Sequence, residues 1–187
     1  MGGGFCIACA APGVRALGEG EEEAFSCDAC GVVAPRAFLF DGLARAWFEG
    51  GELLHETAGA VIRRGERTLL FLRTRYPRLY TVPAGHVEEG AEPEAEMRRE
   101  VAEETGLAVT GARRLWPGER LLLEDSCRRG AERHVWNAYL AEAEGVPRLS
   151  DEGRVVGWYY DAEVRELAAA RMLHAPVEAI LRRLGIV

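Results

Sequence analysis

Two CxxC pairs in the first thirty residues constrain the N-terminal fold of this 187-residue chain more than any other feature. Cys6 and Cys9 form the first pair, and Cys27 and Cys30 form the second after an interval of seventeen residues. Each pair can present two thiolates to one metal ion, and this spacing is typical of a tetrahedral zinc site. A fragment of this size cannot bury enough apolar surface to fold unaided, so we expect a bound metal to stabilise it.

Two other uses of these cysteines fit the sequence less well. A pair of disulfides suits a secreted protein, but the N-terminus has neither the basic region nor the clean apolar region of a secretion signal. A redox CxxC motif would need a surrounding βαβ pattern, which this segment lacks. A zinc ion bound by four thiolates has no open coordination position for a substrate. We therefore predict a zinc ribbon over residues 1–35, with a structural role or at most a recognition surface, in a cytoplasmic protein.

Charge and composition exclude several functions. The formal net charge is −7, and all 23 basic residues are arginine. The absence of lysine excludes a Schiff-base lysine and the lysine of a Walker-type phosphate loop. An acidic chain without a strong basic patch is poorly suited to nucleic acid. If the ligand is a polyanion, something other than the overall charge must attract it, and a bound divalent cation is the simplest candidate. The sequence contains no run of eighteen apolar residues, so no membrane span is predicted.

Residues 36–54 join the predicted ribbon to a larger domain at 55–187. The segment is rich in apolar and aromatic side chains. We interpret it as a connector that packs the ribbon against the larger domain; a substrate-facing or dimer-forming role is the alternative.

The larger domain has an α/β pattern. Two short apolar runs, 57–64 and 67–74, flank a turn and predict a β-hairpin. A helix is predicted over 92–105, with Pro93 in its first turn and Gly106 just past its end. The other predicted elements are strands at 107–116, 133–143 and 153–160, a helix at 161–170 with Asp161 as its N-cap, and a helix at 175–185 with Pro176 in its first turn. Together they predict a mixed sheet flanked by helices.

The helix at 92–105 has three carboxylates on one face. Glu100, Glu103 and Glu104 project together because residues three and four apart share a helical face. Like charges at this spacing destabilise a helix by about 0.2–0.5 kcal/mol per pair, and the helix dipole disfavours anions in the last turns. Arg98 and Arg99 can each reach a glutamate four positions away, which neutralises the cluster only in part. A solvated acidic face is one explanation, and a site for Mg²⁺ or Mn²⁺, which prefer hard oxygen ligands, is the other.

The segment 85–107, GHVEEGAEPEAEMRREVAEETGL, strongly resembles the Nudix box. That pattern is Gly, five residues, Glu, seven residues and then REUXEEXGU, where U is a bulky aliphatic residue. The matching positions are Gly85, Arg99, Glu100, Val101, Glu103, Glu104, Gly106 and Leu107. The resemblance covers 23 residues and implies a Nudix α/β/α sandwich with a mixed sheet, here preceded by the small zinc ribbon.

One position departs from the Nudix pattern. Its first glutamate should stand at position 91, where this chain has Ala91. Glu92 is adjacent, but one helical residue is a rotation of about 100°, so it cannot simply take that place. In the family this glutamate assists the loop and metal region, whereas the REUXEE glutamates bind most of the metal. The departure therefore concerns activity or the number of metal ions, and not the fold.

The resemblance implies a Mg²⁺- or Mn²⁺-dependent hydrolase that attacks a diphosphate linkage. Glu100, Glu103 and Glu104 would hold the metal, together with the backbone carbonyl of Gly85. The metal would clamp the diphosphate and lower the pKa of the attacking water. Arg99 would orient the glutamates through ion pairs, and Glu103 or a carboxylate from a later loop would act as the general base.

Residues outside the box could complete the site. Glu152 lies just before a predicted strand, where many Nudix proteins have a catalytic or metal-binding glutamate; a turn residue is the alternative. Arg73 and Arg75 precede the box and could contact substrate phosphates, or form a solvated edge. We interpret His134 as a packing residue or a phosphate contact, and Cys127 as a small buried apolar residue.

Three functions are compatible with these residues. A ribbon followed by a Nudix box resembles NADH pyrophosphatases and some ADP-ribose or FAD pyrophosphatases. The SQPWPFPxS-like stretch of the NADH group is absent after the box, which makes ADP-ribose the first substrate to assay. The alternatives are a nucleoside triphosphate diphosphatase and a Nudix-like protein that binds its ligand without turnover, which Ala91 favours. We expect a small-molecule nucleotide substrate and no membrane or nucleic-acid partner; because many relatives are dimers, a homodimer is the assembly to test.

Overall fold

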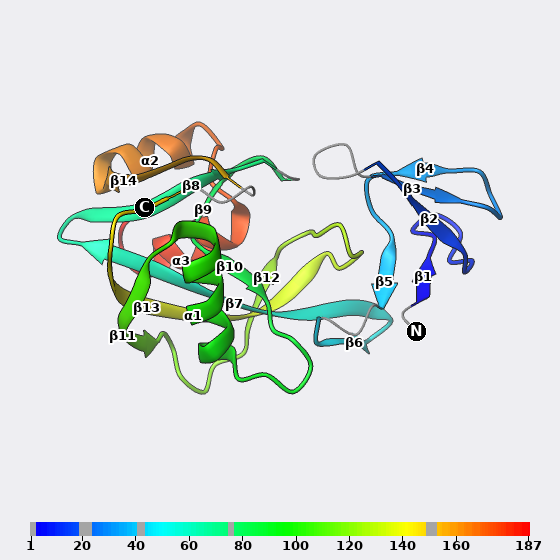
Figure 1. The fold of residues 1–187 in the computed structure, drawn as a ribbon, viewed down its shortest axis with the longest axis horizontal. Helices are drawn as coiled ribbons and strands as arrows, with labels where there is room; N and C mark the ends of the chain where they lie inside the picture. Colours follow the sequence, from blue (N-terminus) through cyan, green and yellow to red (C-terminus); the bar gives the residue numbers. More distant parts are fainter. Residues whose placement is uncertain (1–2, 19–23, 41–43, 75–76, 149–152) are drawn as a thin grey trace.

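The computed structural model describes residues 3–18, 24–40, 44–74, 77–148 and 153–187 (Figure 1). Two small sheets form the N-terminal part, and a nine-stranded sheet forms the remainder. In Figure 1 the N-terminal strands, in blue, lie at one end of the molecule, and the three helices gather around the large sheet at the other.

Strand β7 (Glu52–Arg64) is the centre of the large sheet. It pairs in parallel with β13 (Arg133–Glu144) and, at its far end, antiparallel with β8 (Arg67–Arg73). β11 (Ala108–Arg114) extends the sheet beyond β13, and β14 (Gly153–Tyr160) extends it beyond β8. The main path β11-β13-β7-β8-β14 therefore contains both strand directions. The predicted hairpin and mixed sheet are confirmed.

Four short strands complete the large sheet. They are β6 (Ala46–Glu49), β9 (Tyr80–Thr81), β10 (Ala84–His86) and β12 (Leu121–Glu124). β6 and β10 pair with β7, β9 pairs with β8, and β12 pairs with β13. Strands of two to four residues are too short to show an apolar alternation, and long-range partners define them. β10 matters most, because it places Gly85 opposite Ala58 of β7.

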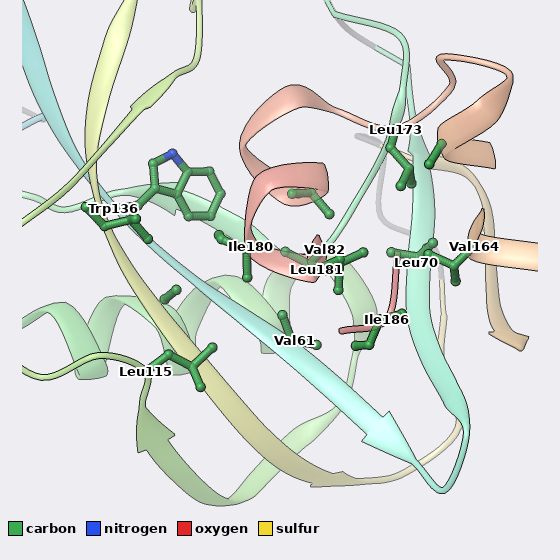
Figure 2. Close-up of a cluster of buried hydrophobic side chains, with 14 residues drawn as sticks. Val61, Leu70, Val82, Leu115, Trp136, Val164, Leu173, Ile180, Leu181 and Ile186 are labelled. Atoms are coloured by element: carbon green, nitrogen blue, oxygen red, sulfur yellow. The ribbon is translucent and has the colours of Figure 1, made fainter. Parts of the chain in front are cut away.

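Helices cover both faces of the sheet. Alternate residues of β7 serve opposite faces: Ala60 and Ile62 pack with one core cluster, and Val61 packs with the other. On the first face, α1 (Pro93–Thr105) buries Met97 and Val101. On the second face lie α2 (Asp161–Ala169) and α3 (Ala175–Arg183). Figure 2 shows this second core, in which Val61 and Leu70 from the strands meet Ile180 and Leu181 of α3. The predicted α/β/α sandwich is confirmed.

The helix ends follow local chemistry, with one correction. α1 has Pro93 in its first turn and ends at Gly106, whose φ of +68° is a left-handed conformation that suits glycine. The prediction that Asp161 caps α2 is wrong. The N-cap is Tyr160, whose N–H donates to Glu163 Oε2 at 2.7 Å. Asp161 is the first helical residue, and its carboxylate instead accepts from Arg63 Nη1 at 2.6 Å.

The N-terminal module consists of short antiparallel strands. β2 (Val14–Leu17), β3 (Ala24–Cys27) and β4 (Val33–Ala34) form one sheet, and β1 (Gly3–Phe5) pairs with β5 (Phe38–Phe40). The proposed limits of ribbon, connector and Nudix domain stay predictions; β6 and the first residues of β7 place the end of the connector in the large sheet. In the described part of the chain, no helix is long and apolar enough to cross a membrane.

The connector lies against a loop of the large domain. Ala37 N–H donates to the Arg128 carbonyl at 3.1 Å, and Leu39 N–H donates to the Arg129 carbonyl at 3.3 Å. Arg36 donates to the carbonyls of Cys127 and Ala131 at 2.7 and 2.8 Å. The N-terminal module is therefore joined to the loop that follows β12.

Candidate active site

A single arginine organises the carboxylates of α1. Arg99 donates to Glu96, Glu100 and Glu103, each at 2.7 Å. Partial burial acts to lower the pKa of the Arg99 guanidinium, but the hydrogen bond to Glu96 and the charges of the three glutamates raise it above its ordinary value. The predicted contact between Arg99 and Glu103 is present, as is the one between Arg98 and Glu94 at 2.9 Å. Arg99 thus offsets the like-charge repulsion expected among the glutamates of this helical face.

Strand β10 lies directly against these carboxylates. A Cβ atom at position 85 would lie 2.0 Å from Glu100 Oε1, so any larger residue there would force the Glu100 carboxylate to move. The next carboxylate is held by the same strand, because Ala84 N–H donates to Glu104 Oε2 at 2.9 Å. Glu104 is buried, whereas the side chain of Glu103 is 60% exposed. Of the three glutamates, Glu103 is therefore the most open to a ligand in solvent.

The carboxylates face a cleft of about 410 Å³. Its lining combines the glutamates and Arg99 of α1 with three arginines from other elements: Arg73 of β8, and Arg128 and Arg129 from the loop after β12. Arg73 was predicted as a phosphate contact, and Arg128 and Arg129 were not, because no local pattern ties that loop to the helix. Carboxylates that can hold a cation, next to guanidinium groups that can bind phosphate, suit a phosphorylated ligand.

The four N-terminal cysteines converge on one point. Cys6 Sγ lies 3.7 Å from Cys30 Sγ, and Cys9 Sγ lies 3.7 Å from Cys27 Sγ; all four sulfur atoms are within 4.8 Å of one another. Zinc–sulfur bonds of about 2.3 Å in a tetrahedron give sulfur–sulfur separations of about 3.8 Å. All four cysteines are unbridged by disulfides. This cluster fits the donor set of a structural zinc ribbon.

A second group of potential ligands borders the cleft, and sequence reasoning missed it. His55, His86, Cys127 and His134 each place a ligand atom within 4.8 Å of the others. Burial, and then the nearby histidines, hold the pKa of His86 well below its ordinary value. Burial also raises the pKa of the Cys127 thiol, which disfavours a free reactive thiolate.

Asp125 lies beside this group as a buried carboxylate. It accepts a hydrogen bond from Trp136 Nε1 at 2.8 Å, and His174 Nε2 lies 3.1 Å from its other oxygen. Burial acts to raise the pKa of Asp125, but contacts with His174, His134 and Trp136 lower it below its ordinary value. A carboxylate held in this way is suited to positioning its neighbours rather than to accepting a proton.

A family model described as NUDIX domain matches residues 53–183. The chain belongs to the Nudix family. This match spans well over half of the sequence, and it confirms the predicted Nudix enzyme. The matched region includes α1, β10 and all the residues that line the cleft except Ala44.

Solved structures of other Nudix proteins are similar to this chain. A MutT Nudix hydrolase from Burkholderia pseudomallei is 29% identical, with a TM-score of 0.51 over 58% of this chain and 84% of that chain. An Ap4A hydrolase from C. elegans is 23% identical, with a TM-score of 0.54 over 70% and 94%. The Nudix domain of Shewanella oneidensis NrtR, solved with ADP ribose, is 20% identical, with a TM-score of 0.55 over 74% and 88%. The last two likenesses show the Nudix fold alone.

The position that departs from the Nudix pattern is held through its backbone. The Ala91 carbonyl accepts a hydrogen bond from Arg45 Nη2 at 2.6 Å, and the Ala91 side chain packs against the core under α1. Arg45 also pairs with Glu56 of β7. Glu92 is the N-cap residue of α1 and makes no side-chain cap hydrogen bond. Arg45 thus ties the start of the Nudix helix to the sheet at the position where the family pattern has a glutamate.

Two predicted Nudix site residues, Arg75 and Glu152, lie outside the described residues. Their proposed roles in substrate binding and catalysis stay predictions. The other predicted ligands and contacts, Gly85, Arg99, Glu100, Glu103, Glu104 and Arg73, all line the one cleft. His134 also lines it, although it is buried.

Proposed function

We propose that this protein hydrolyses the diphosphate linkage of a nucleoside diphosphate derivative, with ADP-ribose as the first substrate to test. One observation supports this most strongly: the acidic face of α1, Gly85 and four arginines line one cleft. The arginines suit the phosphates, and the carboxylates would hold a divalent cation. The Nudix proteins whose structures were solved with ADP ribose or named for Ap4A support the same ligand class.

The donor set fits a magnesium or manganese ion. Glu100, Glu103, Glu104 and the carbonyl of Gly85 would hold it, because all of these donors are hard oxygen atoms of residues that line the same cleft. The bound ion supplies charge stabilisation for the diphosphate and promotes ionisation of a water molecule.

Side chains of the protein would perform the other roles, which are to position the metal ligands, bind the phosphates and accept a proton. Arg99 keeps Glu100 and Glu103 in place through charge-assisted hydrogen bonds. Arg73 would bind and orient the phosphates, so that the linkage faces the acidic helix. Glu103 has the most exposed carboxylate of the three and is the best placed to take a proton from the attacking water.

A hydrolysis screen tests this proposal. ADP-ribose, NADH, FAD, diadenosine polyphosphates and nucleoside triphosphates would each be incubated with the protein and Mg²⁺ or Mn²⁺. We expect AMP and a phosphorylated partner from ADP-ribose, whereas a nucleoside monophosphate and pyrophosphate would indicate a triphosphate diphosphatase. Glu104→Gln should abolish turnover. Glu94→Gln is the matched control, since it removes one charge from the same helix at a half-exposed ion pair with Arg98.

The departure at Ala91 makes binding without turnover the rival function. Calorimetry with ADP-ribose separates the two. Binding by the wild type with no hydrolysis of any substrate, or equal hydrolysis by wild type and Glu104→Gln, would reject the enzymatic proposal. Sedimentation of the same samples would test the predicted homodimer.

We also propose that the four N-terminal cysteines hold one structural zinc ion. The convergence of the sulfur atoms supports it. Elemental analysis of a Cys27→Ser, Cys30→Ser variant should show one zinc fewer per chain than the wild type. Unchanged zinc content would reject the assignment.

A further inference from the structure

Four side chains from separate parts of the large domain meet beside the cleft. His55 lies on β7, His86 on β10 and His134 on β13, and Cys127 lies in the loop after β12. His55 and His134 are direct partners in the parallel pairing of β7 and β13, so their side chains share one face of the sheet. We call this group the His3Cys cluster.

The spacing within the His3Cys cluster is that of ligands around one metal ion. His86 Nε2 lies 3.2 Å from His134 Nε2, and His55 Nδ1 lies 3.5 Å from Cys127 Sγ. Tetrahedral zinc with ordinary bond lengths separates two nitrogen ligands by about 3.3–3.4 Å, and a nitrogen from a sulfur by about 3.5–3.6 Å. A hydrogen bond could explain either contact by itself. It does not explain why both contacts converge so that all four atoms lie within 4.8 Å.

The cluster is removed from solvent, as structural zinc sites are. His55 and His134 are 0% and 1% exposed, and the three imidazole rings are 5.0–5.3 Å apart between centroids. Polar groups removed from water are destabilising unless their donors and acceptors are satisfied. A metal ion satisfies three imidazole nitrogens and a sulfur at once.

An outer contact orients one of the ligands. The buried Nδ1 of His134 makes no hydrogen bond and lies 3.5 Å from Asp125 Oδ2, while Nε2 of the same ring faces the cluster. Metal-bound histidines usually direct the second ring nitrogen at a carboxylate or carbonyl, which fixes the ring and its tautomer. Asp125 is itself held by Trp136 and His174.

The connector holds the loop that presents the sulfur ligand. Arg36 Nε donates to the Cys127 carbonyl at 2.7 Å. Gly130, at the end of that loop, has a φ of +95°, and a Cβ there would lie 2.5 Å from Phe38. The loop is therefore confined between the connector and the sheet.

We propose that the His3Cys cluster is a second zinc site, separate from the cysteine ribbon and from the acidic face of α1. Imidazole and thiolate ligands select zinc and similar divalent transition metals over magnesium. Four protein ligands fill a tetrahedral zinc, so the site is structural. It fastens β7, β10 and β13 to the loop after β12, and His86 is adjacent to Gly85. The proposal does not depend on which substrate the protein hydrolyses, or on whether it does.

Metal analysis of the full chain tests the proposal. Protein purified without chelators should contain two zinc ions per chain. Cys27→Ser, Cys30→Ser should lose one, and His55→Ala, His134→Ala should lose the other while the ribbon zinc is retained. Leu54→Ala, Val135→Ala is the matched control, because it shortens the residues next to His55 and His134 on the same two strands, whose side chains lie on the opposite face of the sheet. Full zinc content in the His55, His134 variant would overturn the proposal, as would a wild type with a single zinc that the ribbon variant loses.

Cobalt provides a second readout that does not require loss of a buried histidine. In a background with all four ribbon cysteines (Cys6, Cys9, Cys27 and Cys30) changed to serine, added Co²⁺ should give the visible absorption of a tetrahedral site and a near-ultraviolet thiolate charge-transfer band. A further Cys127→Ser change should remove that charge-transfer band. An octahedral spectrum, or a thiolate band that survives Cys127→Ser, would contradict the proposal. Circular dichroism of each variant distinguishes loss of metal from loss of fold.

Discussion

Glu100 occupies the space that any side chain at position 85 would need. The contact would be 2.0 Å from a Cβ to the Glu100 carboxylate oxygen, so the glycine of β10 and the glutamate of α1 depend on each other. The close approach also brings the Gly85 backbone next to the proposed metal ligands. Gly85 stands at the start of the Nudix box and Glu100 in its C-terminal half, and in the fold they are in direct contact.

Gly85→Ala should therefore displace Glu100 rather than unfold the protein. We expect hydrolysis to fall about 100-fold, because a shift of about 1 Å in a reacting group has that effect. Overpacking should lower the free energy of unfolding by about 1–3 kcal/mol. Gly111→Ala is the control, since a Cβ there meets only Glu142 Oε2 at 3.7 Å. Equal activity of the two variants would contradict the proposed role of Gly85.

Arg99→Lys should weaken metal binding while preserving the charge. Lysine cannot reproduce the fork that contacts Glu96, Glu100 and Glu103. We expect affinity for Mn²⁺ to fall about 10–100-fold, as for other changes behind metal ligands. Titration calorimetry measures it. Arg98→Lys is the control on the same helix and should bind Mn²⁺ like the wild type; a normal affinity in Arg99→Lys would show that the fork is dispensable.

Arg36→Ala should destabilise the loop after β12. The Arg36 side chain is 14% exposed and donates to two carbonyls of that loop. Losing such charge-assisted bonds should reduce the free energy of unfolding by about 1.5–3 kcal/mol. Arg15→Ala removes an exposed ion pair with Asp28 in the same module and should have almost no effect. Denaturant unfolding measures the stability of both variants. Equal unfolding midpoints for Arg36→Ala and Arg15→Ala would show that Arg36 does not stabilise the loop.

Because Glu52 forms an ion pair with Arg133, the free energy of unfolding should decrease as the pH falls into the acidic range. The hydrogen bond from Arg133 lowers the pKa of Glu52 below its ordinary value of about 4.3. Because the folded pKa is the lower one, the stabilisation is present above the unfolded pKa and is lost as pH falls through the folded value. An NMR titration should find the depressed midpoint in the wild type. In Arg133→Gln the midpoint should return toward the ordinary value, and no change would exclude Arg133 as the cause.

Local patterns predicted the elements whose signals lie within a few residues. The limits of α1 follow from Pro93 and Gly106, and the shared face of Glu100, Glu103 and Glu104 follows from helical spacing. Asp161 misled the prediction because its carboxylate bonds to Arg63, almost one hundred residues away, so the cap falls to Tyr160. Only tertiary contacts decide such a competition.

The His3Cys cluster could not be predicted from the sequence. Its four members are spread over β7, β10, β13 and a loop, with no fixed spacing comparable to CxxC. Cys127 and His134 read as isolated packing residues until the parallel pairing of β7 and β13 brings His55 to their side. The arginines at 128 and 129 were overlooked for the same reason.

The pairing of residues 36–39 with the loop after β12 has a practical consequence for protein engineering. Trimming the chain to the region that the family match covers, from residue 53 onward, would delete Arg36 and Phe38 along with the ribbon. The excised domain would keep every glutamate of α1, but it would lose the hydrogen bonds from residues 36–39 that hold the loop after β12 at the edge of the cleft. Studies of this enzyme should therefore begin with the whole polypeptide, and chimaeras that exchange its ribbon should keep residues 36–39 with their own loop.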